Sequence, residues 1–332
     1  MANHDNNNEI KEGFVDISSN KQVNKIYKKR GRAIRITSIV LSILLLIGGS
    51  GLLYYYSVLN SLKFVDISDN NSTKATSSTL PTSDGTFSKS QLSNDELLED
   101  SKVLNVMLFG EDNARGQEFG RSDSMIMLSI DNRHKKLKMT SFQRDSYVYV
   151  DGYGYDKLTN AYAYGGPKLT IQTIESNFGV KVDRYAVVDY ASFIEIIDVL
   201  GGIDLELTQD EIDYINYQLY KNKQSDTRTT ITDAPGKVHL TGQQALWYAR
   251  NRGLDSSEEG IGIAGDDWDR TSRQRKLLET MFNDMKGADL TQIISIVGKV
   301  GPLVTTNLKK DEITALVSHS MTYLTYSVEQ YT

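Results

Sequence analysis

The sequence predicts a layered α/β domain over residues 101–325, in which helices cover both faces of a central mixed sheet. Two observations indicate this fold class. Short apolar runs typical of strands begin at Val103, and segments with apolar residues at helical spacing alternate with strand-like runs further along the chain. A third observation, an uncharged run near the N-terminus, places one membrane-spanning helix in front of this domain.

The N-terminal region predicts an anchor whose first residues stay in the cytoplasm. Residues 36–56 (ITSIVLSILLLIGGSGLLYYY) carry no charge and, at about 1.5 Å per residue, can cross a hydrocarbon core of roughly 30 Å. Residues 1–35 hold eight Lys and Arg against four Asp and Glu, so the positive-inside rule makes them a basic cytoplasmic tail. The alternative, a cleaved signal peptide, fits less well because no A-x-A-like site follows.

The external part is predicted to begin with a flexible stalk over residues 57–100, since the chain from about Ser68 to Asp95 is rich in Ser, Thr and Asn. The chain carries −6 overall and its first 35 residues +4, which leaves −10 for the remainder. An acidic external domain is a poor nucleic-acid binder. Four His and no Cys exclude disulfide frameworks, thiol nucleophiles and Cys-based zinc sites.

Within the domain, the runs VLNVMLF, MIMLSI and LKMTSF are predicted as strands, and the middle one is apolar on both faces, as in a buried sheet. A helix is predicted around Phe193 to Leu200, ended by Gly201-Gly202 and followed by the strand IDLEL. Thr241 is a candidate N-cap for the helix GQQALWYAR. These elements support the layered arrangement.

The helix predicted from about Arg270 to Met285 has an unusual first part. Its apolar stripe of Leu277, Leu278, Met281, Phe282 and Met285 extends backwards to Gln274, Arg273 and Arg270, while Arg275 and Lys276 fall off it. Polar groups on the inward face of a helix N-terminus indicate a polar cavity, where free N–H groups and the helix dipole favour an anion.

Charged residues stand at the ends of several of these elements, where functional groups of layered α/β folds usually lie. They are Asp112, Arg121, Asp123, Arg144, Asp145, Arg250 and Arg252. Converging arginines repel one another unless a multiply charged anion such as a phosphate lies between them. Carboxylates beside a phosphate then call for a divalent cation, and Asp112 and Asp123 supply the hard oxygen ligands that magnesium prefers. The alternative is a set of surface ion pairs, worth at most about 1 kcal/mol each.

Six motifs, taken together and in order, resemble the LytR-CpsA-Psr family of Gram-positive cell-wall proteins: GRSDSMIMLSID, SFQRD, KLTNAYAYGGP, VLGGIDLEL, HLTGQQALWYARNR and DRTSRQRKLL. The resemblance covers about residues 103–285. It implies a phosphotransferase of the cell envelope that moves an anionic glycopolymer (wall teichoic acid, capsular or related polysaccharide) from an undecaprenyl-pyrophosphate carrier to peptidoglycan. The sequence departs from the family at Gln143, where a proline is usual.

The resemblance also implies roles for individual residues. Asp112 and Asp123 would hold Mg²⁺, or Mn²⁺ in its place. The pyrophosphate would be bound by Arg121, Arg144, Arg250, Arg252 and Arg270, with Asp267 and Gln274 completing the site. Lys157 is assigned either to the rim of this site or to a structural role. The candidate catalytic residues are Arg121, Arg144, Asp145 and Asp267, the two carboxylates being alternative bases for the acceptor hydroxyl.

The sequence leaves three points open. The long acidic loop GLDSSEEGIGIAG leaves Asp266 and Asp269 as alternatives to Asp267. The lipid tail of the donor needs an apolar groove between sheet and helices, whose opening the sequence does not locate. Two other functions are alternatives. A polyprenyl-pyrophosphate hydrolase would use the same residues, with water replacing the sugar hydroxyl. A membrane-anchored envelope regulator or lipid-binding protein would act without catalysis.

Overall fold

The structure is a computed structural model, and it describes residues 56–65, 100, 102–112, 119–224, 229–254 and 265–332. The chain divides into residues 1–56 and 57–332, and the fold given below is that of the second unit. Among the described residues, no helix has both the length and the apolar character needed to cross a membrane. The predicted span lies outside these residues except for Tyr56, as do residues 66–99 of the predicted stalk.

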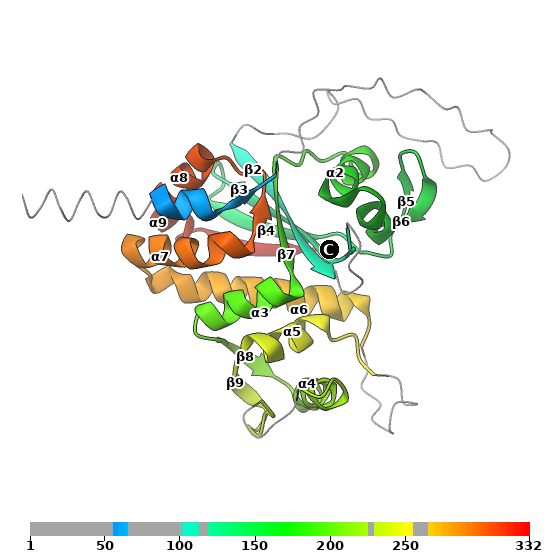
Figure 1. The fold of residues 1–332 in the computed structure, drawn as a ribbon, viewed down its shortest axis with the longest axis vertical. Coiled ribbons are helices and arrows are strands. Elements are labelled where there is room, and N and C mark those ends of the chain that lie inside the picture. Colours follow the sequence, from blue (N-terminus) through cyan, green and yellow to red (C-terminus); the bar gives the residue numbers. More distant parts are fainter. Residues whose placement is uncertain (1–55, 66–99, 101, 113–118, 225–228, 255–264) are drawn as a thin grey trace, which may run out of the picture. The chain divides into compact units, whose positions relative to one another are not determined.

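A mixed sheet organises residues 57–332 (Figure 1), and it has seven strands among the described residues, in the order β1-β10-β7-β2-β3-β4-β11. Strand β2 pairs antiparallel with β3 and parallel with β7. The bounds are β1 (Lys63–Phe64), β2 (Val103–Asp112), β3 (Arg121–Asp131), β4 (Lys136–Ser141), β7 (Arg184–Asp189), β10 (Thr305–Thr306) and β11 (Ser327–Tyr331). The predicted mixed-sheet α/β fold is confirmed, and the three predicted strands are β2, β3 and β4.

Two strands of the sheet lie outside residues 101–325. Strand β1 belongs to the segment assigned to the stalk, and it pairs parallel with β10. Strand β11 follows residue 325 and pairs parallel with β4. Both are short and mostly exposed edge strands. Their sequences therefore lack the apolar periodicity by which the inner strands are recognised.

Helices lie on both sides of this sheet, with α2 on one side and α3, α5 and α6 on the other (Figure 1). The helices are α2 (Leu158–Phe178), α3 (Tyr190–Val199), α4 (Gln209–Lys221), α5 (Gly242–Arg250), α6 (Asp267–Asp284), α7 (Leu290–Val300), α8 (Lys310–Ser318) and α9 (Ser320–Tyr323). Two further antiparallel pairs complete the unit: the hairpin of β5 (Tyr147–Val150) with β6 (Gly154–Lys157), and β8 (Ile203–Leu207) with β9 (Gly236–Leu240), which α4 separates along the chain.

Local sequence signals account for the helix ends. The Thr241 hydroxyl accepts from the N–H of Gln244, so the predicted N-cap of α5 is confirmed. After α3, Gly201 and Gly202 adopt φ values of +90° and +88°, a left-handed conformation that suits glycine and ends the helix as predicted.

Side chains of β7, β2 and β3 form rows that alternate between the two faces of the sheet. The rows on the α2 face are Tyr185, Met107 and Met127, then Val187, Phe109 and Met125, all buried in one core with α2. The rows on the face of α3 and α6 are Ala186, Leu108 and Ile126, then Val188, Gly110 and Ser124. The second face thus carries smaller side chains than the first.

Candidate active site

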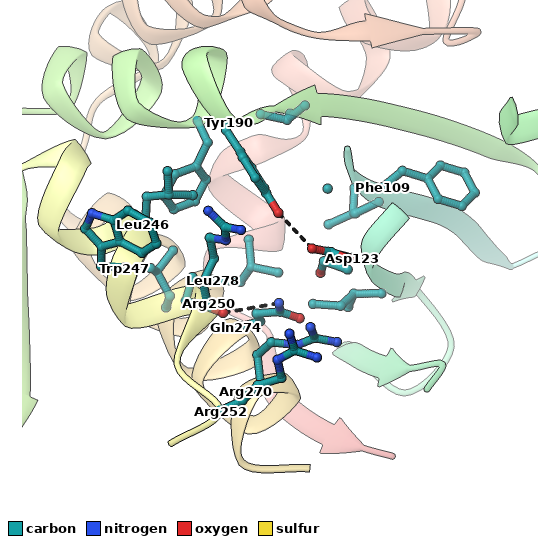
Figure 2. A pocket seen from close by; sticks show the side chains of 18 of the residues that line it. Phe109, Asp123, Tyr190, Leu246, Trp247, Arg250, Arg252, Arg270, Gln274 and Leu278 are labelled. Carbon is teal, nitrogen blue, oxygen red and sulfur yellow. Dashed lines mark hydrogen bonds between the residues drawn. The ribbon is translucent and has the colours of Figure 1, made fainter. Parts of the chain in front are cut away.

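A cavity of about 440 Å³ lies between these smaller rows and helices α3, α5 and α6 (Figure 2). Its apolar wall includes Leu108, Ile126, Ala186, Val188, Phe193, Ile196, Leu246, Leu277, Leu278 and Met281, and its polar residues include Asp123, Tyr190, Arg250, Arg252, Arg270 and Gln274. Figure 2 shows Asp123, Arg250 and Gln274 pointing into the same space. The cavity therefore joins an apolar surface to a cluster of charged groups.

Asp123 connects three elements at this cluster. One of its carboxylate oxygens pairs with the Arg144 guanidinium, and the other accepts a hydrogen bond of 2.8 Å from the Tyr190 hydroxyl. Sheet topology explains the meeting, because Ile126 pairs with Ser141 across β3 and β4, so the start of β3 faces the chain that leaves β4. The predicted residues Asp123 and Arg144 are thus brought together.

Tyr190 is a site residue that the sequence did not single out. It is the first residue of α3, directly after β7, and the Arg250 guanidinium lies 4.4 Å from the centre of its ring. Burial, followed by the charge of Asp123, raises the pKa of Tyr190, so the hydroxyl stays protonated and donates. Its position at a strand end was the one signal that could have identified it.

Arg270 is the most deeply buried charge of the cluster, with 2% of its side chain exposed. Its Nη2 lies 2.6 Å from Asp267 Oδ1, but the pair is not in hydrogen-bonding geometry. Burial lowers the pKa of the guanidinium, and the carboxylates of Asp267 and Asp123 oppose this shift. A buried guanidinium is costly unless its donors are satisfied, so this arrangement fits an anionic ligand.

Several other buried polar atoms around the cavity lack a hydrogen-bond partner among the described residues. They are Arg144 Nε, Asn251 Nδ2, Gln274 Oε1, both oxygens of Asp267, and Nε and Nη2 of Arg270. Native proteins leave few such atoms unpaired. Four of these atoms are donors and three are acceptors, and their concentration beside one cavity fits a polar ligand that completes their bonding.

The start of α6 separates the three candidate aspartates. Asp266 caps the helix by accepting from the N–H of Asp269 at 2.9 Å, and the Asp269 carboxylate accepts from the N–H of Asp266 at 3.2 Å. Asp267 takes no part in this capping box and pairs with Arg270 instead. Of the three, Asp267 is therefore the carboxylate directed at the cluster.

Six predicted residues are not among those that line the cavity: Arg144 and Asp267, which pair with the lining residues Asp123 and Arg270, and Asp112, Arg121, Asp145 and Lys157. Arg121 is the exposed first residue of β3, opposite Asp112, and neither is among the lining residues. Lys157 Nζ pairs with Asp145 Oδ1 at 2.7 Å, with 56% and 42% of the two side chains exposed. Asp145 is linked to the cluster only loosely, 3.8 Å from Arg144 Nε.

Helix α6 has more than one buried side, contrary to the single stripe predicted. Arg273, expected on the inward stripe, donates to Glu211 Oε1 at 2.9 Å and so faces α4. Arg275, expected to fall off the stripe, is buried and donates to Ser141 Oγ at 2.6 Å. Gln143, which stands where the family usually has proline, donates to Thr271 Oγ1 at 3.3 Å. The contacts with α4 and with the end of β4 explain why one stripe does not describe this helix.

Asp112 and Asp123 are the carboxylates predicted to hold a divalent cation. Asp112 ends β2 and Asp123 is in the first part of β3, and the pairing of Asp112 with Arg121 brings both carboxylates to the same end of the two strands. No group of three or more His, Cys, Asp or Glu side chains suited to a metal occurs in the part of the chain that the structure describes. Two carboxylates fit magnesium, which keeps several waters and takes phosphate oxygens as further ligands.

Comparison with known proteins places the chain in a family. The profile of the LytR_cpsA_psr family matches residues 60–332. The polyisoprenyl-teichoic acid–peptidoglycan teichoic acid transferase TagV of Bacillus subtilis (strain 168) is 30% identical over 233 residues, which are 69% of this chain and 56% of that protein. The chain thus spans less than two thirds of that relative.

Two solved structures share the fold. The structure of TagT bound to LIIa-WTA is 26% identical, with a TM-score of 0.54. The match covers 69% of this chain and 78% of the TagT chain. The crystal structure of B. subtilis TagV is 29% identical, also with a TM-score of 0.54. The match covers 70% of this chain and 84% of the TagV chain. On the match to its family profile, the chain belongs to the LytR_cpsA_psr family, as its motifs predicted.

Proposed function

We propose that this protein transfers an anionic glycopolymer, a teichoic acid or a related polysaccharide, from a polyprenyl-pyrophosphate carrier to peptidoglycan. The observation that carries the proposal is the buried Arg270, whose Nε and Nη2 make no hydrogen bond among the described residues and which lines a cavity with an apolar wall. A lipid pyrophosphate combines the two properties that this cavity matches. The relative TagV is named as a transferase of this kind, and TagT has been solved with LIIa-WTA bound.

The chain's own residues would act mainly by positioning and charge neutralisation, which is what phosphoryl-type transfer requires. Arg144, Arg250, Arg252 and Arg270 bind the pyrophosphate oxygens, and the apolar wall holds the prenyl chain. The acceptor hydroxyl attacks the phosphorus next to the polymer sugar. A new P–O bond forms, the bond to the carrier's phosphate breaks, and polyprenyl phosphate leaves.

The acceptor's proton passes to a carboxylate, and the contacts favour Asp267 over Asp145 as this base. A hydrogen bond from Lys157 lowers the pKa of Asp145, which weakens it as a base. The oxygens of Asp267 are buried, accept no hydrogen bond among the described residues and lie beside Arg270. Asp267→Asn is expected to slow transfer while leaving donor binding intact, whereas Asp145→Asn is expected to affect transfer much less.

We further propose that Asp112 and Asp123 hold Mg²⁺, or Mn²⁺ in its place. Bound there, the ion would neutralise charge on the phosphate oxygens. In this structure Arg144 and Tyr190 occupy the two oxygens of Asp123, so binding requires Arg144 to turn toward the pyrophosphate. Asp123→Asn is expected to weaken Mn²⁺ binding followed by electron paramagnetic resonance, and unchanged binding would contradict the site.

The location proposed for the protein is the membrane of a Gram-positive cell, with residues 1–35 inside, residues 36–56 spanning, and the stalk and domain outside. The support is the uncharged run and its basic flank. Because the chain lacks cysteine, single cysteines can report the topology. An impermeant maleimide should label Ser88→Cys but not Ser19→Cys in intact cells, and labelling of both or of Ser19→Cys alone would contradict this orientation.

The function itself is tested with the full chain, Mg²⁺, a polyprenyl-pyrophosphate-linked glycan and peptidoglycan fragments. Mass spectrometry should detect the phosphodiester product and polyprenyl phosphate. Release of phosphorylated glycan without acceptor attachment would show a hydrolase instead. If the Arg250→Ala, Arg252→Ala double variant retained the protein's effect on polymer attachment in cells, a non-catalytic regulator would be the better description.

A further inference from the structure

The hairpin of β5 and β6 presents tyrosines on its outer side. Val148 and Val150 are buried in the core with α2, and the alternate positions Tyr147, Tyr149 and Tyr155 lie on the opposite face, which we call the tyrosine face. The rings of Tyr147 and Tyr155 stack with centres 5.6 Å apart, and Tyr149 meets Tyr155 edge-on at 5.5 Å. Three aromatic rings therefore form one surface.

Hairpin stability explains only part of this surface. Cross-strand aromatic pairs stabilise two-stranded sheets, and Tyr149 with Tyr155 is such a pair. Tyr147, however, leaves 72% of its surface exposed. Tyrosine is stiff and amphipathic, so it binds partners at a low cost in conformational entropy, and exposed groups of tyrosines mark binding surfaces.

The tyrosine face adjoins the proposed transfer site. Tyr147 lies directly across the hairpin from Lys157, whose Nζ is 2.7 Å from Asp145 Oδ1. The next residue before Asp145 is Arg144, which pairs with Asp123 in the cavity. A chain molecule that lies along the tyrosine face would therefore extend past Lys157 and Asp145 to the charged cluster.

Charge indicates which chain molecule fits. Lys157, which lies opposite Tyr147 on the tyrosine face, is paired with Asp145, so the two charges offset each other. Asp156 pairs with Val148 on the opposite side of the hairpin and accepts from the Tyr164 hydroxyl of α2, so its charge is not part of the tyrosine face. The tyrosine face therefore has no excess positive charge to attract a polyanion, whereas uncharged sugar rings place their weakly positive C–H groups on the negative faces of aromatic rings.

We propose that the tyrosine face binds the N-acetylhexosamine rings of the acceptor glycan and presents its hydroxyl to the transfer site. The inference rests on the proposed function for the identity of the acceptor. It assigns the anionic donor to the arginine-lined cavity and the weakly charged acceptor to the tyrosine face, so the two substrates approach from different sides of Arg144.

The test uses the full chain in detergent and a hexamer of N-acetylglucosamine as the probe, with affinity measured by calorimetry. Tyr147→Ala is expected to weaken binding about tenfold, the usual loss when a central aromatic contact is removed. Tyr147→Trp, which keeps an aromatic face, should retain binding. Tyr220→Ala is the matched control, since Tyr220 is similarly exposed, at 66%, on α4. In the transfer reaction, Tyr147→Ala should raise KM for the acceptor with kcat little changed.

Three results would overturn the inference. The first is that the natural chain does not bind the hexamer at millimolar concentration. The second is that Tyr147→Ala binds the hexamer equally well with an unchanged melting temperature, and the third is that Tyr147→Ala loses affinity for a glycerol-phosphate polymer instead of for the hexamer. If Tyr147→Ala unfolds the hairpin, the comparison of Tyr147→Trp with Tyr147→Leu decides, because both retain bulk and only one retains an aromatic face. Hexamer binding through the tyrosines without any phosphodiester product would instead contradict the proposed function alone.

Discussion

The two faces of the central sheet are built from the same three strands, yet one is filled and the other is hollow. On the α2 face, Met107, Phe109, Met125, Met127 and Tyr185 pack into a continuous core. On the other face, the neighbouring positions hold Gly110, Ser124 and Ala186, and a cavity remains between sheet and helices. Alternation along a strand thus separates a stabilising surface from a binding surface within one layer.

The largest expected difference is between substitutions of Arg270 and Arg275, which are both buried arginines of α6. Arg270 meets the cavity, whereas Arg275 donates to Ser141 at the end of β4. Arg270→Gln is expected to lower the transfer rate about 100- to 1,000-fold, as when one preorganised donor to a charged transition state is lost. Arg275→Gln should instead cost about 1–3 kcal/mol of folding free energy.

Mass spectrometric rate measurements and urea unfolding separate the two outcomes. Arg270→Gln removes one partner of the buried pair with Asp267, so it should also lower the unfolding midpoint, and its transfer rate is measured on protein shown to be folded. If Arg275→Gln lost activity as fully as Arg270→Gln while remaining folded, the division between a binding side and a packing side of α6 would be wrong.

Met107 and Leu108 test the two faces at adjacent positions of one strand. Met107→Ala opens a new space in a closed core and is expected to cost about 2–5 kcal/mol. Leu108→Ala enlarges a cavity that already exists, so it should cost less than half as much. Chemical denaturation of both variants gives the comparison, and equal losses would indicate that the cavity face is packed as tightly as the core.

Much of this arrangement follows from the sequence, because its signals are local. The runs of β2, β3 and β4, the Thr241 cap and the glycines after α3 each act within a few residues, and the cluster around Asp123 could be expected from charges at strand ends. Strand pairing also decides contacts that no local pattern encodes. The register of β2 and β3 shifts between Gly110 and Glu111, opposite Asp123, so two neighbouring residues, Asp123 and Ser124, line the cavity, while Arg121 is the exposed first residue of the strand.

Other features depend on neighbours that are distant in sequence. Arg275 is buried by Ser141, 134 residues earlier in the chain, so the periodicity of α6 gave no sign of it. Tyr190 acquires its role only because β7 runs parallel to β2 and brings it to Asp123. The hollow face itself arises from small residues on three separate strands, a pattern that becomes visible once the register is known.

Ala186 and Ala161 test whether the cavity face, unlike the core on the α2 face, can accommodate a larger side chain. Ala186→Phe projects a ring into the cavity, so we expect about tenfold weaker binding of polyprenyl pyrophosphate, with a stability change below about 1 kcal/mol. Ala161→Phe overfills the core between α2 and the sheet and is expected to cost about 1–3 kcal/mol. Unchanged lipid binding by Ala186→Phe, measured with a fluorescent short-chain analogue, would mean that the prenyl chain lies elsewhere.

The smallest expected effects come from two tyrosine hydroxyls, one on each side of the sheet. Tyr190 donates to Asp123 at 2.8 Å, and Tyr185 donates to the carbonyl of Val65 at 2.9 Å. Tyr190→Phe keeps the ring on which Arg250 stacks and removes one hydrogen bond, so transfer should fall about fivefold, close to 1 kcal/mol. Tyr185→Phe removes a bond that joins β7 to the segment after β1, so stability should fall by about 1 kcal/mol with the transfer rate unchanged. If Tyr185→Phe lost activity at full stability, the packed face would contribute to the reaction. The division into a face that stabilises the fold and a face that binds the substrate would then be wrong.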